Sequence, residues 1–257
     1  MAGMVRFVFL AIALLTVSPA LGTDRGEEAG GTLRLILGPA QPGQEDVQGA
    51  LVVTLKDGFK TYWKRPGDSG VPTVVDFDGS LNLASADFLF PTPSLHELPG
   101  DRTVSYKDRV VFPIRARRID PLAPLTLRVT GMLGMCAEIC IPVPIDLTAQ
   151  SSERIDPSAA AVMFEGANAL PREAPSGISV KDVERDDEGR VEAVTIDGPN
   201  VRPRPTLFVA SDRDRDLVPY ARTEDNGPYR FVLDKPAQGP LEAVVSFGGV
   251  GARMVIE

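Results

Sequence analysis

VVFPIRARRIDPLAPLTLRVT, residues 110–130, contains two stretches in which apolar residues recur at every second position. The apolar positions of the first are Val110, Phe112, Ile114 and Ala116, alternating with Val111, Pro113, Arg115 and Arg117. Those of the second are Leu125, Leu127 and Val129, alternating with Thr126, Arg128 and Thr130. Side chains two residues apart lie on the same face of a β-strand, so both stretches predict strands with one buried face.

The same pattern recurs on both sides of this segment. Similar runs, each bounded by Gly, Pro, Asp or Asn, lie at residues 33–37, 50–55, 59–63, 74–77, 84–90 and 143–147. Many short strands separated by turn residues are typical of a β-sandwich. We therefore expect an all-β sandwich over residues 23–155.

The alternation is interrupted once, between residues 156 and 176. Asp156 can cap a helix that begins at Pro157, and Pro171 ends the run SAAAVMFEGANAL. The segment 156–176 is thus expected to be a short helix and a linker. Further runs at 178–183, 191–196, 206–209, 229–233, 241–247 and 253–256 predict a second, smaller β-sandwich over residues 177–257.

The first 22 residues resemble an export signal. Arg6 precedes the apolar run FVFLAIALLTV, and the small residues of ALG follow at positions 20–22. A run this short is typical of a cleaved signal peptide rather than a membrane span. We expect cleavage after Gly22, with Thr23 as the first mature residue and the periplasm as destination.

Charge and motifs exclude several functions. The net charge is −8 at pH 7 and no basic stripe is present, so nucleic acid is not an expected partner. Zinc-ligand spacing, a P-loop, a dinucleotide fingerprint and a Ser-His-Asp order are also missing. Hydrolase and nucleotide-binding functions therefore have no support.

Both cysteines of the chain, Cys136 and Cys140, lie in GMLGMCAEICIPVP, residues 131–144. Two nearby thiols in an exported protein tend to form a disulfide. Closing so short a loop stabilises the fold by only about 2 kcal/mol, which a chain of this length hardly needs. Pro142 and Pro144 lack the backbone N–H that a central ladder uses, so the pair is expected beside a sheet edge that a partner can reach. A structural disulfide, a redox disulfide and a metal site all remain open at this point.

Other residues near the pair allow alternative interpretations. Four sulfurs of the kind that selects Cu(I) come from Met132, Met135, Cys136 and Cys140, although core packing is the usual role of methionine. No other metal and no cofactor is expected.

Glu138 is either an exposed turn residue or a charge that disfavours a nearby thiolate. Tyr62 and Trp63 either belong to the core or line the rim of the cysteine site. His96, the only histidine, is expected in a loop without a catalytic role.

Three segments in a fixed order resemble a known family. They are LVVTLKDGFKTYWKRPGDSGVP, VSYKDRVVFPI and LTLRVTGMLGMCAEICIPVPIDL, all between Ala50 and Ala149. Together they are similar to the N-terminal periplasmic domain of the thiol:disulfide interchange protein DsbD, and more closely to its suppressor-of-copper-sensitivity relative ScsB. The resemblance implies an immunoglobulin-like β-sandwich whose cysteine pair shuttles electrons by thiol-disulfide exchange.

The resemblance also implies partners and site residues. A DsbD-like membrane electron-transfer protein would reduce Cys136 and Cys140, and the pair would then reduce periplasmic thioredoxin-fold proteins, as a component of a protein-disulfide reductase system. Partner exchange is assigned to the second cysteine, Cys140. The stretch Leu95–Arg102 corresponds to a cap over the disulfide, with Leu98 as the lid. Because the chain ends at Glu257 without membrane or thioredoxin-like domains, the electron source is expected to be another chain.

Overall fold

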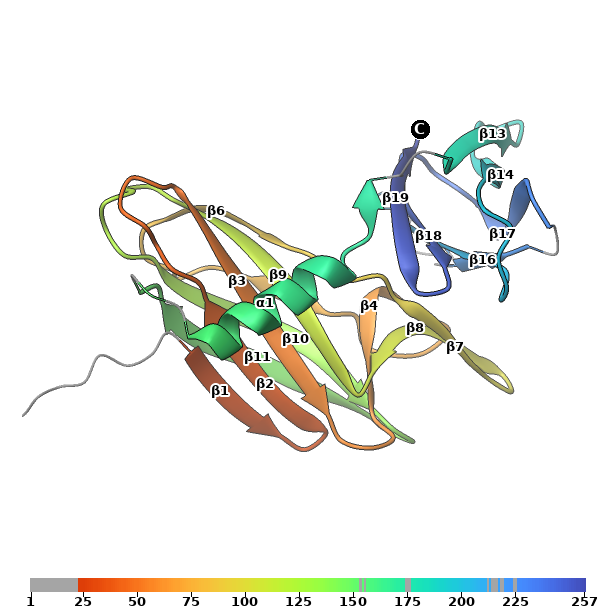
Figure 1. Cartoon of the computed structure of the whole chain (residues 1–257). Coiled ribbons are helices and arrows are strands. Elements are labelled where there is room, and N and C mark those ends of the chain that lie inside the picture. Colours follow the sequence, from red (N-terminus) through yellow and green to blue (C-terminus); the bar gives the residue numbers. More distant parts are fainter. Residues whose placement is uncertain are drawn as a thin grey trace, which may run out of the picture.

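The structure, a computed structural model, describes residues 23–257 except 153, 155, 174–176, 212, 214–216, 218–219 and 224–225. The expected signal peptide, residues 1–22, lies outside the described residues. Two β-sandwiches joined by one helix make up the described part (Figure 1). In that part of the chain, no helix has the length and apolar character needed to cross a membrane.

The N-terminal sandwich comprises the strands that precede the helix. They are β1 (Thr23–Glu28), β2 (Gly31–Leu37), β3 (Asp46–Leu55), β4 (Lys60–Gly67), β5 (Val74–Asp76), β6 (Leu83–Phe88), β7 (Ser94–Leu98), β8 (Asp101–Lys107), β9 (Arg109–Arg118), β10 (Thr126–Cys136) and β11 (Cys140–Gln150). One sheet has the order β1-β2-β3-β9-β6, and the other has the order β11-β10-β4-β8-β7 with β5 paired to β10. The immunoglobulin-like fold class expected from the sequence is confirmed.

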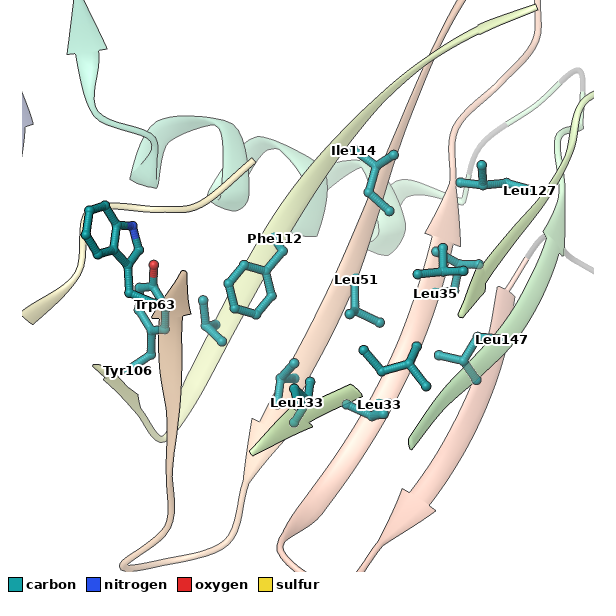
Figure 2. Close-up of a cluster of buried hydrophobic side chains, with 14 of the residues drawn as sticks. Leu33, Leu35, Leu51, Trp63, Tyr106, Phe112, Ile114, Leu127, Leu133 and Leu147 are labelled. Carbon is teal, nitrogen blue, oxygen red and sulfur yellow. The ribbon is translucent and has the colours of Figure 1, made fainter. Parts of the chain in front are cut away.

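The segment 110–130 connects these two sheets. Its first alternating stretch forms β9 in one sheet and its second lies in β10 of the other. The alternate apolar residues of both strands, among them Phe112, Ile114, Leu127 and Val129, are buried in the shared core. Figure 2 shows Phe112, Ile114, Leu127 and Leu133 within this layer. Removing such side chains from water is the main term that holds the sheets together.

A helix covers the outer face of the first sheet. It is α1 (Pro157–Ala169), and Asp156 accepts hydrogen bonds from the backbone N–H groups of Ser158 and Ala159. The predicted cap and start of the helix are thus confirmed. Its residue Ala159 packs on Val52 and Val111, which is why Val111 is apolar although it faces away from the sandwich core. Figure 1 shows α1 lying across β3 and β9.

The C-terminal sandwich is smaller. Its strands are β12 (Arg172–Glu173), β13 (Ser179–Arg185), β14 (Val191–Asp197), β15 (Thr206–Ala210), β16 (Tyr220–Arg222), β17 (Tyr229–Ala237), β18 (Leu241–Phe247) and β19 (Val250–Ile256). They form the sheets β12-β19-β18-β15-β16 and β13-β14-β17, which enclose a core of their own. This second β-sandwich is the one that the sequence predicts.

The two sandwiches pack directly against each other. The ring of Trp63 on β4 lies 6.2 Å from the ring of Phe208 on β15, and both side chains are about 1% exposed. Lys64 Nζ lies 2.7 Å from Glu242 Oε2, and the Arg65 guanidinium donates to the carbonyl of Ser211. Strand β4 therefore supplies part of the contact between the two sandwiches.

One expected loop is a hairpin. The sequence predicts a loop over Leu95–Arg102, but residues 94–98 and 101–107 pair as the antiparallel strands β7 and β8. His96 therefore lies on a strand and is half-buried. The turn Pro99-Gly100 is short enough to connect two paired strands directly.

Candidate functional site

The cysteine pair closes the β10–β11 hairpin. The two strands pair without a register shift up to the rung Cys136↔Cys140, and residues 137–139 form the turn. Cys136 and Cys140 are joined by a disulfide. The side chain of Cys136 is only 1% exposed, whereas Cys140 is exposed. A nucleophile approaching from solvent therefore reaches the sulfur of Cys140 more easily than that of Cys136.

Tyr62 on β4 places a polar side chain beside the disulfide. Its hydroxyl lies 3.7 Å from Cys140 Sγ, and because the sulfur is disulfide-bonded, the hydroxyl is the donor. Burial, with a smaller effect from the charge of Asp101, raises the pKa of Tyr62 to about 12. The phenol therefore keeps its proton at neutral pH and can donate a hydrogen bond to a thiolate at Cys140.

Glycines make room for the Tyr62 ring. A Cβ on Gly70, whose φ is +114°, would overlap the ring, and a Cβ on Gly134 would lie 3.3 Å from it. Both the backbone conformation of Gly70 and the lack of space exclude a side chain there. Gly70 is thus required for the position of the Tyr62 ring beside the disulfide, whereas a Cβ on Gly131 would instead overlap the backbone of Val74.

A polar cluster continues from Tyr62 along the same face of the sheet. Lys60, two residues before Tyr62, lies opposite Cys136 in the register. Its Nζ lies 2.9 Å from Thr103 Oγ1, 3.5 Å from Asp101 Oδ2 and 5.8 Å from the centroid of the Tyr62 ring. The ammonium group thus connects β8 to the strand that carries Tyr62.

His96 lies at the far end of this cluster. Its Nδ1 is 2.8 Å from the hydroxyl of Ser105, which is 3.4 Å from that of Thr103. Burial, followed by the positive charges of Lys107 and Lys60, lowers the pKa of His96 to about 4. The imidazole is therefore neutral at physiological pH, and the structure gives it no contact with either cysteine.

The other predicted site residues are placed as follows. Glu138 is exposed in the hairpin turn. Trp63 does not line the site, because it is buried in the core cluster that also contains Phe208. Leu98 pairs with Asp101 at the end of β7, but its side chain, and with it the expected lid, lies outside the described residues.

The four proposed copper ligands do not converge. Met132 is 42% exposed, whereas Met135, three residues along the same strand, is fully buried in the core. An odd spacing on a strand directs the two side chains to opposite faces. Within the described ranges, no group of three or more His, Cys, Asp and Glu side chains could hold a metal ion.

Sequence reasoning missed Lys60 and Asp101. The even spacing of Lys60 and Tyr62 places both side chains on one face of their strand, and that signal was available in the sequence. The contribution of Asp101 depends on the β7–β8 hairpin, for which the sequence predicts a loop.

Fold and site together define a class of protein: a two-sandwich β protein with one disulfide at a hairpin turn, one of its sulfurs buried and the other exposed. Residues 38–151 match the family model described as thiol:disulfide interchange protein DsbD, N-terminal. This part of the chain is similar to that family.

One solved structure agrees with this fold. The N-terminal periplasmic domain of ScsB from Proteus mirabilis is 20% identical, with a TM-score of 0.68 over 89% of this chain and 93% of that chain. A CsuC–CsuE chaperone-tip adhesion subunit complex from archaic Csu pili of Acinetobacter baumannii is 10% identical over 86% of this chain and 96% of that chain. Its TM-score of 0.20 is too low to indicate a shared fold. Comparison with curated protein sequences found no match.

Proposed function

We propose that the chain is a periplasmic thiol-disulfide exchange protein that passes reducing equivalents through Cys136 and Cys140. The observation that carries this proposal is the asymmetry of the disulfide: Cys140 is exposed beside the Tyr62 hydroxyl, while Cys136 is 1% exposed. A purely structural bond needs no such difference between its sulfurs. The match of residues 38–151 to the DsbD N-terminal family model supports the same conclusion.

The exchange proceeds in two thiol-disulfide steps. In the reduced protein, the Cys140 thiolate attacks a partner disulfide, so that a mixed disulfide forms and one partner sulfur leaves as a thiolate. The Cys136 thiolate then attacks Cys140 Sγ, which restores the Cys136–Cys140 disulfide and releases the second partner thiolate. Two electrons pass to the partner, whose two sulfurs take up two protons. No cofactor takes part.

Tyr62 assists whenever Cys140 is a thiolate. A neutral hydroxyl 3.7 Å from the sulfur can donate a hydrogen bond to the thiolate as the negative charge develops. The same hydrogen bond stabilises Cys140 in the reduced resting protein.

The cellular setting is part of the proposal. Residues 1–22 direct export and are removed, residues 23–155 form the redox sandwich, and residues 177–257 form the second β domain. The electron donor is a DsbD-like membrane electron-transfer protein, and the acceptors are periplasmic thioredoxin-fold proteins. The export signal in the sequence and the family match of residues 38–151 support this assignment.

Trapping of mixed disulfides tests the proposal. Cys136→Ala leaves Cys140 without its resolving partner, so this variant should accumulate covalent complexes, whereas Cys140→Ala should trap few. Both variants are expressed in the periplasm and examined by non-reducing electrophoresis, with mass spectrometry of each cross-linked band. Complexes through Cys136 alone would reverse the roles of the cysteines. If neither variant forms complexes and the wild-type pair is always oxidised in cells, the disulfide is structural.

A further inference from the structure

The β7–β8 hairpin lies between the disulfide site and the C-terminal sandwich. On the rung His96↔Thr103, the Thr103 side chain faces Lys60. The neighbouring rung is Glu97↔Arg102, whose side chains point to the opposite face because successive residues of a strand alternate. The hairpin thus presents one face to the polar cluster and the other to the second sandwich.

Strand β16 of the C-terminal sandwich contacts this second face. Arg222 Nη2 lies 2.5 Å from Glu97 Oε2, and the Arg102 guanidinium lies 5.3 Å from the centroid of the Tyr220 ring. Tyr220 and Arg222 are two residues apart on β16, so both side chains reach the hairpin from one side. Arg102 also contacts Asp68 Oδ2 at 3.2 Å, which ties the start of β8 to the end of β4.

The hairpin needs such support because of its position. β7 is the outermost strand of its sheet, and its only ladder partner among the described strands is β8. An edge hairpin with few packing contacts frays readily, and a two-stranded hairpin alone is marginally stable in water. Asp101 lies at the turn end of this hairpin, next to Leu98 in the register and beyond Gly67↔Thr103, the last rung that β8 forms with β4. Movement of this unsupported turn end would therefore displace Asp101.

We propose that the C-terminal sandwich controls the reactivity of the disulfide by holding the β7–β8 hairpin in place. Tyr220 and Arg222 are positioning residues: they touch Arg102 and Glu97. The hairpin in turn holds Asp101 against Lys60, where its charge acts on Tyr62, whose hydroxyl lies beside Cys140 Sγ. A carboxylate fixed near the disulfide repels an incoming thiolate, and a fixed hairpin limits access to the sulfurs. Releasing the hairpin should accordingly make the disulfide easier to attack.

The test compares charge-reversal variants of the whole chain. Arg222→Glu places a repulsive charge beside Glu97, and the double variant Glu97→Arg with Arg222→Glu restores the pair with its signs exchanged. Arg230→Glu is the matched control, because Arg230 forms an equally close ion pair with Glu184 inside the C-terminal sandwich, at 2.6 Å. If Arg222→Glu does not fold, Arg222→Gln replaces it in the same measurements, because this variant removes the charge and keeps most of the length of the side chain.

Two quantities are measured on each purified protein. One is hydrogen exchange of the backbone amides in residues 94–107, and the other is the rate at which dithiothreitol reduces the disulfide, followed by alkylation and mass spectrometry. In Arg222→Glu we expect both to rise by about fivefold, the factor that corresponds to about 1 kcal/mol at an exposed ion pair. The double variant should return toward wild type, and Arg230→Glu should match wild type.

Each other outcome rejects the proposal. Unchanged exchange in Arg222→Glu would mean that β16 does not hold the hairpin. Faster exchange with an unchanged reduction rate would mean that the contact supports the hairpin but does not affect the disulfide. Equal effects in Arg230→Glu would indicate a general loosening of the C-terminal sandwich. Because dithiothreitol replaces the biological partner, these results are independent of whether the pair exchanges with other proteins in the cell.

Discussion

The hydroxyl of Tyr62 lies beside the exposed sulfur of Cys140, and its effect can be isolated in a single substitution. Tyr62→Phe removes the donor 3.7 Å from Cys140 Sγ and keeps the buried ring. In the Cys136→Ala background, the alkylation rate of Cys140 at neutral pH should fall by about fivefold, since a hydrogen bond to the thiolate worth about 1 kcal/mol is lost. Iodoacetamide labelling followed by mass spectrometry measures this rate.

Equal alkylation rates with and without the Tyr62→Phe substitution would show that the hydroxyl does not act on the thiolate. Tyr229→Phe is a suitable control, because that hydroxyl donates to the carbonyl of Pro199 in the C-terminal sandwich. It should leave Cys140 labelling unchanged.

His96 gives the fold a dependence on pH. Its pKa is about 4 in the folded chain and about 6.5 in an unfolded one, so between these values the unfolded state binds more protons. The contribution of His96 to the free energy of unfolding is therefore fully present above pH 6.5, and it is lost as the pH falls toward 4. Because the ring is only half-buried, solvent screening reduces the loss to about 1–2 kcal/mol.

Urea unfolding at pH 7 and pH 4.5 tests this dependence. His96→Gln should show a smaller loss of unfolding free energy between the two pH values than wild type does. The carboxylates titrate in both proteins and cancel in the comparison. An equal loss in both would remove His96 from the acid response.

The loop after β4 requires glycine at position 70. Gly70→Ala would place a Cβ within the space of the Tyr62 ring, whereas a Cβ on Gly58 meets nothing within 4 Å. Both glycines have positive φ, so Ala at either position costs about 1 kcal/mol of backbone strain. Only Gly70→Ala should cost a further 1–3 kcal/mol, roughly, from overpacking.

Thermal or urea unfolding of the two alanine variants separates these contributions. Gly70→Ala should also change the rate of disulfide reduction, because the displaced ring carries the hydroxyl away from Cys140. Equal stabilities for the two variants would contradict the packing argument.

Most strands could be predicted from the sequence because residues for a buried and an exposed face alternate along them, as in β11, where every second residue from Val143 to Ala149 is buried. The helix was predictable from Asp156 and Pro157. The β7–β8 hairpin was not, because among the described side chains of β7 only Leu95 packs against the core, while His96 and Glu97 make polar contacts. Pairing of Asp101 with Lys60 crosses 41 residues of sequence, and no local pattern encodes it.

For the molecule as a whole, the packing of β4 on the C-terminal sandwich predicts that the two sandwiches unfold together. Trp63 is the only tryptophan of the chain, so its fluorescence reports on this interface. Phe208→Ala should lower the free energy of unfolding by about 3–4 kcal/mol and shift the native emission of Trp63 to the red, because a cavity opens beside the indole.

Phe231→Ala is the control for this prediction. Phe231 is fully buried in the C-terminal core and is not part of the cluster that contains Trp63. This variant should lose a similar free energy of unfolding without a change in native emission. A red shift in both variants would mean that Trp63 does not report on the interface specifically.

The prolines of β11 have a further consequence for the protein at high concentration. Pro142 and Pro144 pair with Gly134 and Met132 in an unbroken ladder, so the N–H groups that they lack would have pointed outward from the sheet. An extended segment from another molecule finds no donors at these two positions and cannot add to the sheet there. The outer edge of β11 beside Cys140 is thereby protected against the strand-by-strand addition that forms fibres. A redox partner that reaches Cys140 from this edge has to dock through side chains rather than as an extra strand.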